Sequence, residues 1–158
     1  GIKPILGSEI YVTTGSRFDR TSFSSKSSSG LSSQDEMESR HFIHHLVLLC
    51  KNEIGYRNLC QILSKAYMEG FYYKPRADYE VLAKFSEGLV ATTACLKGEV
   101  GFNFFQGQDE KAHKAIWKLH NIFKDDLYLE IQKNGLSEQD LVNEKLIPFS
   151  REHGIPLV

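Results

Sequence analysis

Short runs of β-branched and aromatic residues alternate with longer segments of helical spacing along this chain, and this alternation limits its fold more than any other feature. Such runs predict strands, because branched and aromatic side chains suit a pleated, half-buried surface. Strands separated by helices are typical of α/β proteins with a largely parallel sheet. We therefore expect an α/β fold, with strands at residues 5–12, 44–50, 88–93, 127–131 and 155–158.

Local capping signals place helices between these strands. Asn52, Asp78 and Ser137 each precede a segment of helical spacing, and a short polar side chain at such a position accepts a hydrogen bond from the first turn. Glycines that can adopt a left-handed conformation, Gly70 and Gly154, end two of the helices. We expect helices between Asn52 and Gly70, from Asp78 through Ala83, from Gln108 to Ile122, and between Ser137 and Gly154.

Residues 13–40 have a different character, with serine at positions 24, 25, 27, 28, 29, 32 and 33. A tract of this composition buries little apolar surface, so we expect a flexible, Ser-rich surface loop. Both ends of the chain suggest a fragment, since Gly1 leads directly into a strand-like run and residues 155–158 begin a strand that stops. An unfinished strand leaves an unpaired edge, so we expect further sequence on both sides of a single domain, residues 1–158.

The composition argues against several classes of protein. The chain has 41% hydrophobic and 25% charged residues, as in an ordinary soluble globular protein, and its net charge of −1 offers no argument for strong binding of duplex DNA. No apolar run approaches the roughly 20 residues of a membrane span, and no secretory leader is visible. Three widely spaced cysteines without a CxxC pair indicate free thiols in the cytoplasm and no zinc ribbon. A glycine-rich phosphate loop is also absent from the sequence.

Three residues at strands or strand ends have side chains that bind zinc or manganese in proteins: Glu9, His45 and Cys95. Glu9 is the most informative, because a carboxylate inside an apolar strand is costly unless it is paired or bound to a metal. If the first two strands form a hairpin, Glu9 and His45 become cross-strand neighbours. The alternatives without a metal site stay open. In them, Cys95 is a small buried apolar residue, and either His44 or His45 is simply a surface residue.

A second group mixes aromatic rings with cations, at Tyr72, Tyr73, Lys74 and Arg76. Rings and cations together are typical of sites for nucleic acid or phosphate, so Lys74 and Arg76 are candidate phosphate contacts. A structural loop with a packed tyrosine explains these residues at least as well. Among the other ring-bearing residues, we expect the core to contain Trp117, Phe102, Phe104 and Phe105. We expect solvent-facing or capping positions for His113, His120 and His153.

Four ordered blocks of the sequence resemble one family. They are GIKPILGSEIYV at residues 1–12, HLVLLCKNEIGYRNL at 45–59, GFYYKPR at 70–76, and residues 87–100, which begin EGL and end CLKGEV. Together they resemble the N-terminal PHP (polymerase and histidinol phosphatase) domain of bacterial DNA polymerase III alpha subunits. They fit this family better than stand-alone PHP phosphatases such as histidinol-phosphatase.

The resemblance implies an incomplete, distorted β/α barrel of the PHP type, with flanking barrel strands missing at both ends. It assigns Glu9, His45 and Cys95 to a cluster of divalent metal ions, zinc or manganese, whose other ligands lie outside this chain. It gives His44 no role. The chain has Ser8 and Ala94 where the family often has cysteine and glycine, and neither change removes a ligand. With three ligands only, we expect weak or no metal binding by this chain alone.

The resemblance also implies the function of a larger protein, a DNA-directed DNA polymerase that uses magnesium for template-directed synthesis in the cytoplasm. Its catalytic carboxylates lie outside this chain, so the fragment is expected to be inactive. Its partners are DNA, deoxynucleotides, a proofreading subunit and a sliding clamp, with no membrane. The PHP region is expected to be a metal-dependent phosphoesterase-like module, either a 3′–5′ proofreading exonuclease or a structural element that docks subunits. A stand-alone PHP-family phosphoesterase is the alternative.

Overall fold

The computed structural model describes residues 1–20 and 43–158 of the chain. Most of the expected Ser-rich loop, residues 13–40, lies outside the described residues. The described first part of this expected loop begins with Thr13, which is the last residue of a strand. Residues 14–20 then form bends and a turn. The backbone of Arg17 and Asp19 is held by hydrogen bonds to Asp78 and Arg76, so this part is not a freely extending loop.

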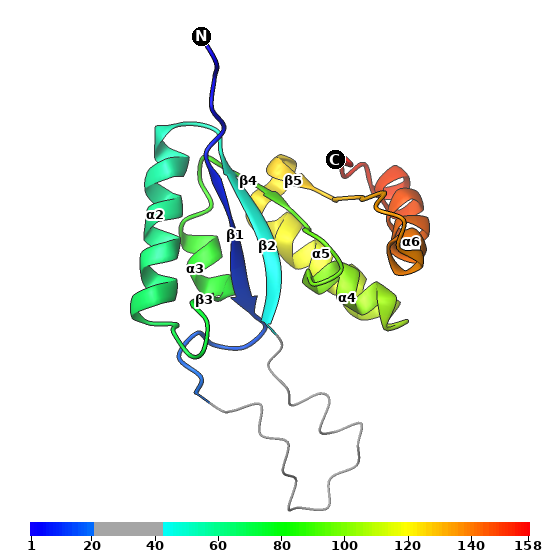
Figure 1. The fold of residues 1–158 in the computed structure, drawn as a ribbon, viewed down its shortest axis with the longest axis horizontal. Coiled ribbons are helices and arrows are strands. Elements are labelled where there is room, and N and C mark those ends of the chain that lie inside the picture. Colours follow the sequence, from blue (N-terminus) through cyan, green and yellow to red (C-terminus); the bar gives the residue numbers. More distant parts are fainter. Residues whose placement is uncertain (21–42) are drawn as a thin grey trace, which may run out of the picture.

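The described residues form a five-stranded sheet with helices packed against it (Figure 1). The strands are β1 (Gly7–Thr13), β2 (Ile43–Cys50), β3 (Arg76–Ala77), β4 (Leu89–Thr92) and β5 (Leu127–Tyr128). The helices are α2 (Glu53–Met68), α3 (Tyr79–Lys84), α4 (Glu99–Phe105), α5 (Asp109–Phe123) and α6 (Ser137–His153), with a 3-10 helix η1 at Lys124–Asp126. A helix both long and apolar enough to cross a membrane is not found in the described part of the chain.

The sheet is mixed, with the strand order β3-β1-β2-β4-β5. β1, β3, β4 and β5 run in one direction and β2 runs against them, so the ladders of β2 with β1 and with β4 are antiparallel. The prediction of a largely parallel sheet is correct in that four of the five strands run in the same direction. It is wrong for the two longest pairings, which are antiparallel because β2 is inserted between β1 and β4. β3 and β5 are the edges, so the sheet formed by the described residues is open and is not a closed barrel.

The last two expected strands are shorter than the sequence suggested. β5 contains only Leu127 and Tyr128, and the expected strand at 155–158 is reduced to a parallel bridge between Leu129 and Leu157. Hydrogen bonds from Leu129 N to Pro156 O at 2.8 Å and from Val158 N to Leu129 O at 3.0 Å hold this bridge. The C-terminal segment therefore continues the sheet beyond β5 without forming a regular strand.

Two of the three expected helix caps are confirmed. Asn52 Oδ1 accepts a hydrogen bond from Gly55 N, and Asp78 Oδ1 accepts one from Val81 N, at the starts of α2 and α3. Ser137 is not a cap: it is the first residue of α6, and its hydroxyl donates to the adjacent Glu138 carboxylate. Gly154, with φ of 70°, ends α6 in the left-handed conformation as predicted.

The helix α4 was not predicted as a helix. Its seven residues are too few to show a helical period clearly, and its three phenylalanines were assigned to the core as a group. Only Phe104 is fully buried, whereas Phe105 on the next position is exposed. Successive side chains of a helix point in different directions, so the three phenylalanines do not share one environment.

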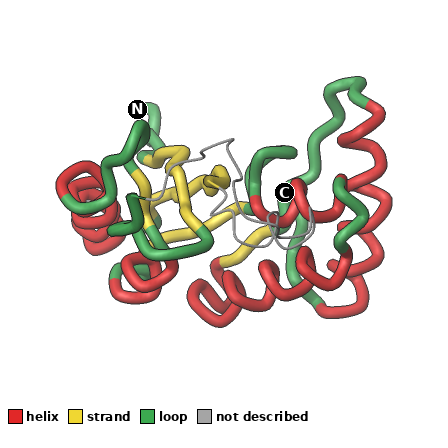
Figure 2. Tube along the Cα trace, turned by 90° about the horizontal axis from the view of Figure 1, so that it is seen from below, coloured by secondary structure: helices red, strands yellow, loops and turns green. Residues whose placement is uncertain are grey.

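The core lies between one face of the sheet and the helices, which form a curved layer around the strands (Figure 2). In β1 and β2 the buried positions alternate, as expected when one face packs on helices. On α5 the buried residues form one stripe, and Trp117 lies outside it with 38% of its surface exposed, so its assignment to the core is wrong. His113 is half-buried between the rings of Phe104 and Phe149, so it is not the solvent-facing residue that was expected.

A buried guanidinium joins the segment after β1 to two helices. Arg17 donates through Nη1 to both carboxylate oxygens of Asp78, at 3.1 Å each, and through Nε to Glu69 at 2.7 Å. Its backbone N also donates to Asp78. Because Asp78 caps α3 and Glu69 follows the last residue of α2, this one side chain sets the position of the residues 14–20 against both helices.

Leu48 in β2 has no exposed surface, so Leu48→Ala is expected to lower the free energy of unfolding by about 3 kcal/mol, from lost burial and the cavity left behind. Leu141→Ala removes the same atoms from a side chain that is 41% exposed on α6, and it is expected to cost less than about 0.5 kcal/mol. Urea unfolding of both variants checks the assignment of the core. Equal losses in the two variants would contradict it.

Glu69→Gln tests the Arg17 contacts through pH. Hydrogen bonds from Lys65 and Arg17 hold the pKa of Glu69 below its ordinary value of 4.5. A carboxylate with a lowered pKa in the folded state stabilises the protein above its ordinary pKa, and this contribution disappears as the pH falls through the lowered value. The variant is expected to be less stable than the native chain near neutral pH and equally stable in strong acid.

The measurement is urea unfolding at pH about 7 and pH about 3. Glu87→Gln is the matched control, because the exposed Glu87 carboxylate forms no ion pair with a described residue. A stability difference for Glu69→Gln that is unchanged in acid would show that the carboxylate charge is not involved.

Candidate metal centre

Alternation along β1 and β2 places Glu9 and His45 on the same face of the sheet, the face not covered by the helical core. In the β1–β2 ladder Glu9 pairs with Val47 and Tyr11 pairs with His45, so Glu9 and His45 are diagonal neighbours. His45 Nδ1 lies 3.0 Å from Glu9 Oε1. The predicted proximity of these two residues is therefore confirmed, as diagonal rather than directly opposed partners.

The imidazole of His45 is held by its surroundings, but one of its nitrogens is not satisfied. Its ring meets the Tyr11 ring edge-on, with centroids 5.2 Å apart, and its side chain is 15% exposed. Nδ1 is buried and has no hydrogen-bond partner in the described part of the chain, because the approach of Glu9 lacks hydrogen-bond geometry. Buried polar atoms are nearly always paired, so an unpaired imidazole nitrogen beside a carboxylate oxygen needs an explanation.

This donor set fits a metal ion. Imidazole nitrogen and carboxylate oxygen are common ligands of zinc, and both are also compatible with manganese. Glu9 is half exposed, so its carboxylate is reachable from solvent. A cation bound between them would satisfy the Nδ1 atom, which has no hydrogen-bond partner among residues 1–20 and 43–158.

Cys95 lies in the loop after β4, and the backbone of this loop docks beside His45. His45 N donates to Lys97 O at 3.0 Å, and His45 forms a parallel bridge with Gly98. Within the loop, Gly98 N donates to Cys95 O, and the Cys95 Sγ accepts from Lys97 N at 3.5 Å. Among residues 1–20 and 43–158, no three His, Cys, Asp or Glu side chains lie close enough together to hold one metal ion. The convergence of Cys95 with Glu9 and His45 stays a prediction.

The two candidate phosphate contacts have different environments. Arg76 is buried, and its guanidinium donates to the backbone carbonyls of Gly70, Arg17 and Asp19. Lys74 is exposed, and its Nζ lies 4.2 Å from the centroid of the Tyr11 ring. Since Tyr11 also contacts His45, Lys74 lies next to the Glu9–His45 pair, whereas Arg76 supports the backbone around it.

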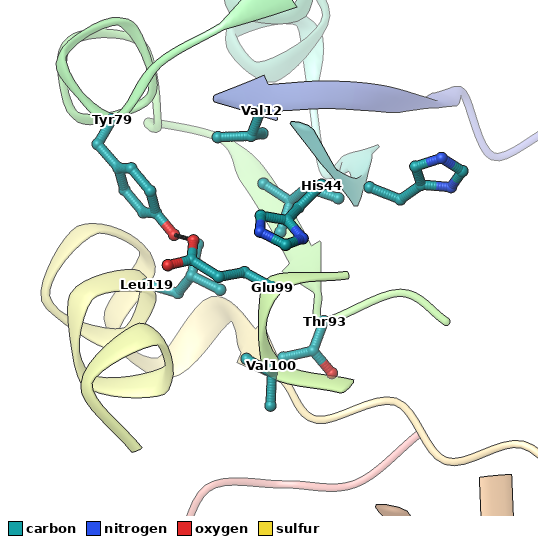
Figure 3. Close-up of a pocket in the computed structure, with 9 residues that line it drawn as sticks. Val12, His44, Tyr79, Thr93, Glu99, Val100 and Leu119 are labelled. Atoms are coloured by element: carbon teal, nitrogen blue, oxygen red, sulfur yellow. Dashed lines mark hydrogen bonds between the residues drawn. The ribbon is translucent and has the colours of Figure 1, made fainter. Parts of the chain in front are cut away.

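A polar cluster on the opposite face of β2 was missed. Tyr79 Oη donates to Glu99 Oε2 at 2.5 Å, and both side chains, with His44, line a small pocket of about 10 Å³, close to the smallest volume that can accommodate one water molecule (Figure 3). Burial, together with Glu99, raises the pKa of Tyr79 well above 10.0, and burial lowers the pKa of His44. The cluster joins β2, α3 and α4, and no local pattern in the sequence connects its three residues.

Comparisons with known proteins agree with the family resemblance found in the sequence. The family model of the PHP domain matches residues 1–134. The whole chain is 44% identical to the DNA polymerase III subunit alpha of Aquifex aeolicus and 40% identical to that of Thermus aquaticus. It is 42% identical to that of Borreliella burgdorferi over 99% of its length. The chain spans 12–13% of the length of these relatives.

A match to the PHP model over residues 1–134, together with similarity along the whole chain to one set of relatives, places this chain in the PHP domain family, as the region homologous to the PHP domain of DNA polymerase III alpha subunits.

Proposed function

We propose that this chain is an internal segment of the PHP domain of a bacterial DNA polymerase III alpha subunit. The observation that supports it is similarity of 40–44% identity to three such subunits over 99–100% of the chain. The whole protein would copy DNA from deoxynucleotides with magnesium, in the cytoplasm, together with a proofreading subunit and a sliding clamp. Its polymerase carboxylates would lie elsewhere, so this segment alone would not polymerise DNA. The stand-alone phosphoesterase alternative is less well supported, since these relatives are about eight times as long as the chain.

The segment itself would contribute to a metal-dependent phosphodiester hydrolysis site in a distorted β/α barrel. Glu9, His45 and Cys95 would be ligands of zinc or manganese, with the remaining ligands on flanking sequence. Such a metal supplies an activated water and stabilises the negative charge on the phosphoryl oxygens. The single observation behind this proposal is the buried Nδ1 of His45, which lies 3.0 Å from Glu9 Oε1 and has no hydrogen-bond partner within the described residues.

The protein's own groups would prepare this site. The Tyr11 ring restricts rotation of the His45 ring, and the hydrogen bond from His45 N to Lys97 O keeps the loop of Cys95 beside it. Lys74 would bind a phosphate oxygen of the substrate, because it is exposed and lies over Tyr11. Arg76 is left out of this proposal, since its guanidinium already donates to three backbone carbonyls.

A second candidate is a structural module that docks the proofreading subunit. It is favoured by one observation, that only two of the three ligand side chains meet within the described residues. In that case the PHP fold would be retained for its surface, and the Glu9–His45 pair would have no metal. The two candidates differ in metal content, which can be measured directly.

The deciding experiment uses a polymerase alpha subunit that carries this sequence in its PHP domain. Glu9→Gln and Cys95→Ser are each expected to weaken zinc or manganese binding by more than about tenfold, because each removes one charged ligand. Metal content by mass spectrometry and manganese-dependent 3′–5′ exonuclease rates measure the loss. Polymerase activity is expected to be unchanged.

Cys60→Ser is the matched control, because Cys60 is an exposed cysteine on α2 that no proposed role involves. Metal content that stays at the native level in both Glu9→Gln and Cys95→Ser would exclude the metal site and leave the structural module. The native segment of 158 residues by itself is expected to bind these metals weakly or not at all.

A further inference from the structure

A tight turn after α2 displays a tyrosine to solvent in an unfavourable backbone conformation. Tyr72 and Lys74 pair across this turn, with Tyr72 N donating to Lys74 O at 3.1 Å. Tyr73 at its tip has φ of 59°, in the left-handed region that bulky residues rarely adopt. Its surface is 82% exposed, so burial does not compensate for the strain. Strained residues of this kind are concentrated at functional sites.

The neighbour of this tyrosine is a cation without an anionic partner. Lys74 forms no ion pair with any described carboxylate, and its Nζ sits 4.2 Å from the centre of the Tyr11 ring. Tyr11 in turn contacts the His45 ring. The turn therefore carries an exposed aromatic ring at its tip, in edge contact with the Tyr72 ring, and in the next residue a positive charge over Tyr11.

Further exposed rings lie around the same end of α2. Tyr67 in its last turn and Phe71 after it are both more than half exposed and stack on one another, with centroids 6.4 Å apart. Arg20 reaches this end of the helix and donates to Glu69 O at 2.7 Å. Aromatic rings combined with cations are the usual means by which proteins bind single strands, since every base has a face for stacking and every phosphate is an anion.

We propose that Tyr73 and Lys74 form a binding element for single-stranded nucleic acid, in which the Tyr73 ring stacks on a base and the Lys74 ammonium contacts a neighbouring phosphate. A protein partner would also use exposed aromatic residues, but Lys74, which forms no ion pair with a described carboxylate, favours a phosphate-bearing ligand. Only one consequence of this inference rests on the proposed function, namely that a nucleic-acid strand bound here would present a phosphodiester to the Glu9–His45 pair. Binding itself requires no metal.

The test is fluorescence anisotropy with the 158-residue chain, EDTA, low salt and a labelled oligodeoxythymidylate of about 12 nucleotides. Tyr73→Gly is expected to weaken binding about tenfold by removing the stacking ring. The same change is expected to preserve or raise the melting temperature, because glycine adopts a positive φ without strain. Tyr73→Phe keeps the ring and is expected to bind like the native chain.

Lys74→Gln is expected to reduce the slope of log affinity against log salt by roughly 0.7, the contribution of one phosphate contact on a single strand. Tyr56→Ala is the control, because Tyr56 is an exposed tyrosine on α2 whose ring contacts no cation among the described residues. It is expected to leave binding unchanged.

Two results would overturn the proposal. One is a Tyr73→Gly chain that binds the oligonucleotide as tightly as the native chain. The other is no binding by the native chain at low salt, which would leave a protein as the partner of the exposed rings. These results are distinguishable from a failure of the proposed metal site. Glu9→Gln is expected to leave oligonucleotide binding intact, whereas Tyr73→Gly is expected to leave metal content intact.

Discussion

The antiparallel ladder between β1 and β2 is the contact on which the rest of the structure depends. Its register pairs Ile10 with Leu46, so that apolar side chains of both strands enter the helical core together. The alternate positions carry Glu9, Tyr11 and His45 on the other face. A slip by one residue in either strand would exchange its two faces, because side chains alternate with a period of two. The same pairing therefore secures the core and assembles the candidate site.

Close backbone contacts then set the loops against this ladder. A Cβ added at Gly98 would come within 2.1 Å of Thr93 O, so only glycine permits the loop after β4 to fold back beside His45. Ala94 at the start of this loop has φ of 57°, which gives a physical reason for the glycine that the family often has there. On the opposite face, Tyr79 and Glu99 join α3 to α4 under β2. The position of Cys95 thus depends on the backbone geometry of this loop, in which the Cys95 Sγ also accepts from Lys97 N.

The two faces of the sheet suit different tasks. The helical face is apolar, apart from the enclosed cluster of His44, Tyr79 and Glu99, and it supplies stability. The open face carries ionisable groups beside aromatic rings, including a buried imidazole nitrogen that lacks a partner in the described residues. A chemistry that needs a metal, a phosphate contact and a surface for bases would use this open face. Membership in the PHP domain family is consistent with that division.

The sequence alone determined the elements that depend on neighbouring residues. The β-branched runs of β1 and β2, the caps at Asn52 and Asp78 and the left-handed glycine after α6 all follow from local backbone and side-chain preferences. A resemblance in four blocks identified the family, whereas the assignment of Glu9, His45 and Cys95 as metal ligands stays a prediction. The tertiary structure decided that β2 lies between β1 and β4, that Arg76 is an internal donor and Lys74 an exposed one, and that Trp117 lies outside the core. It also decided that Glu9 reaches His45 diagonally. These outcomes depend on contacts between residues far apart in the chain, and neither periodicity nor composition contains that information.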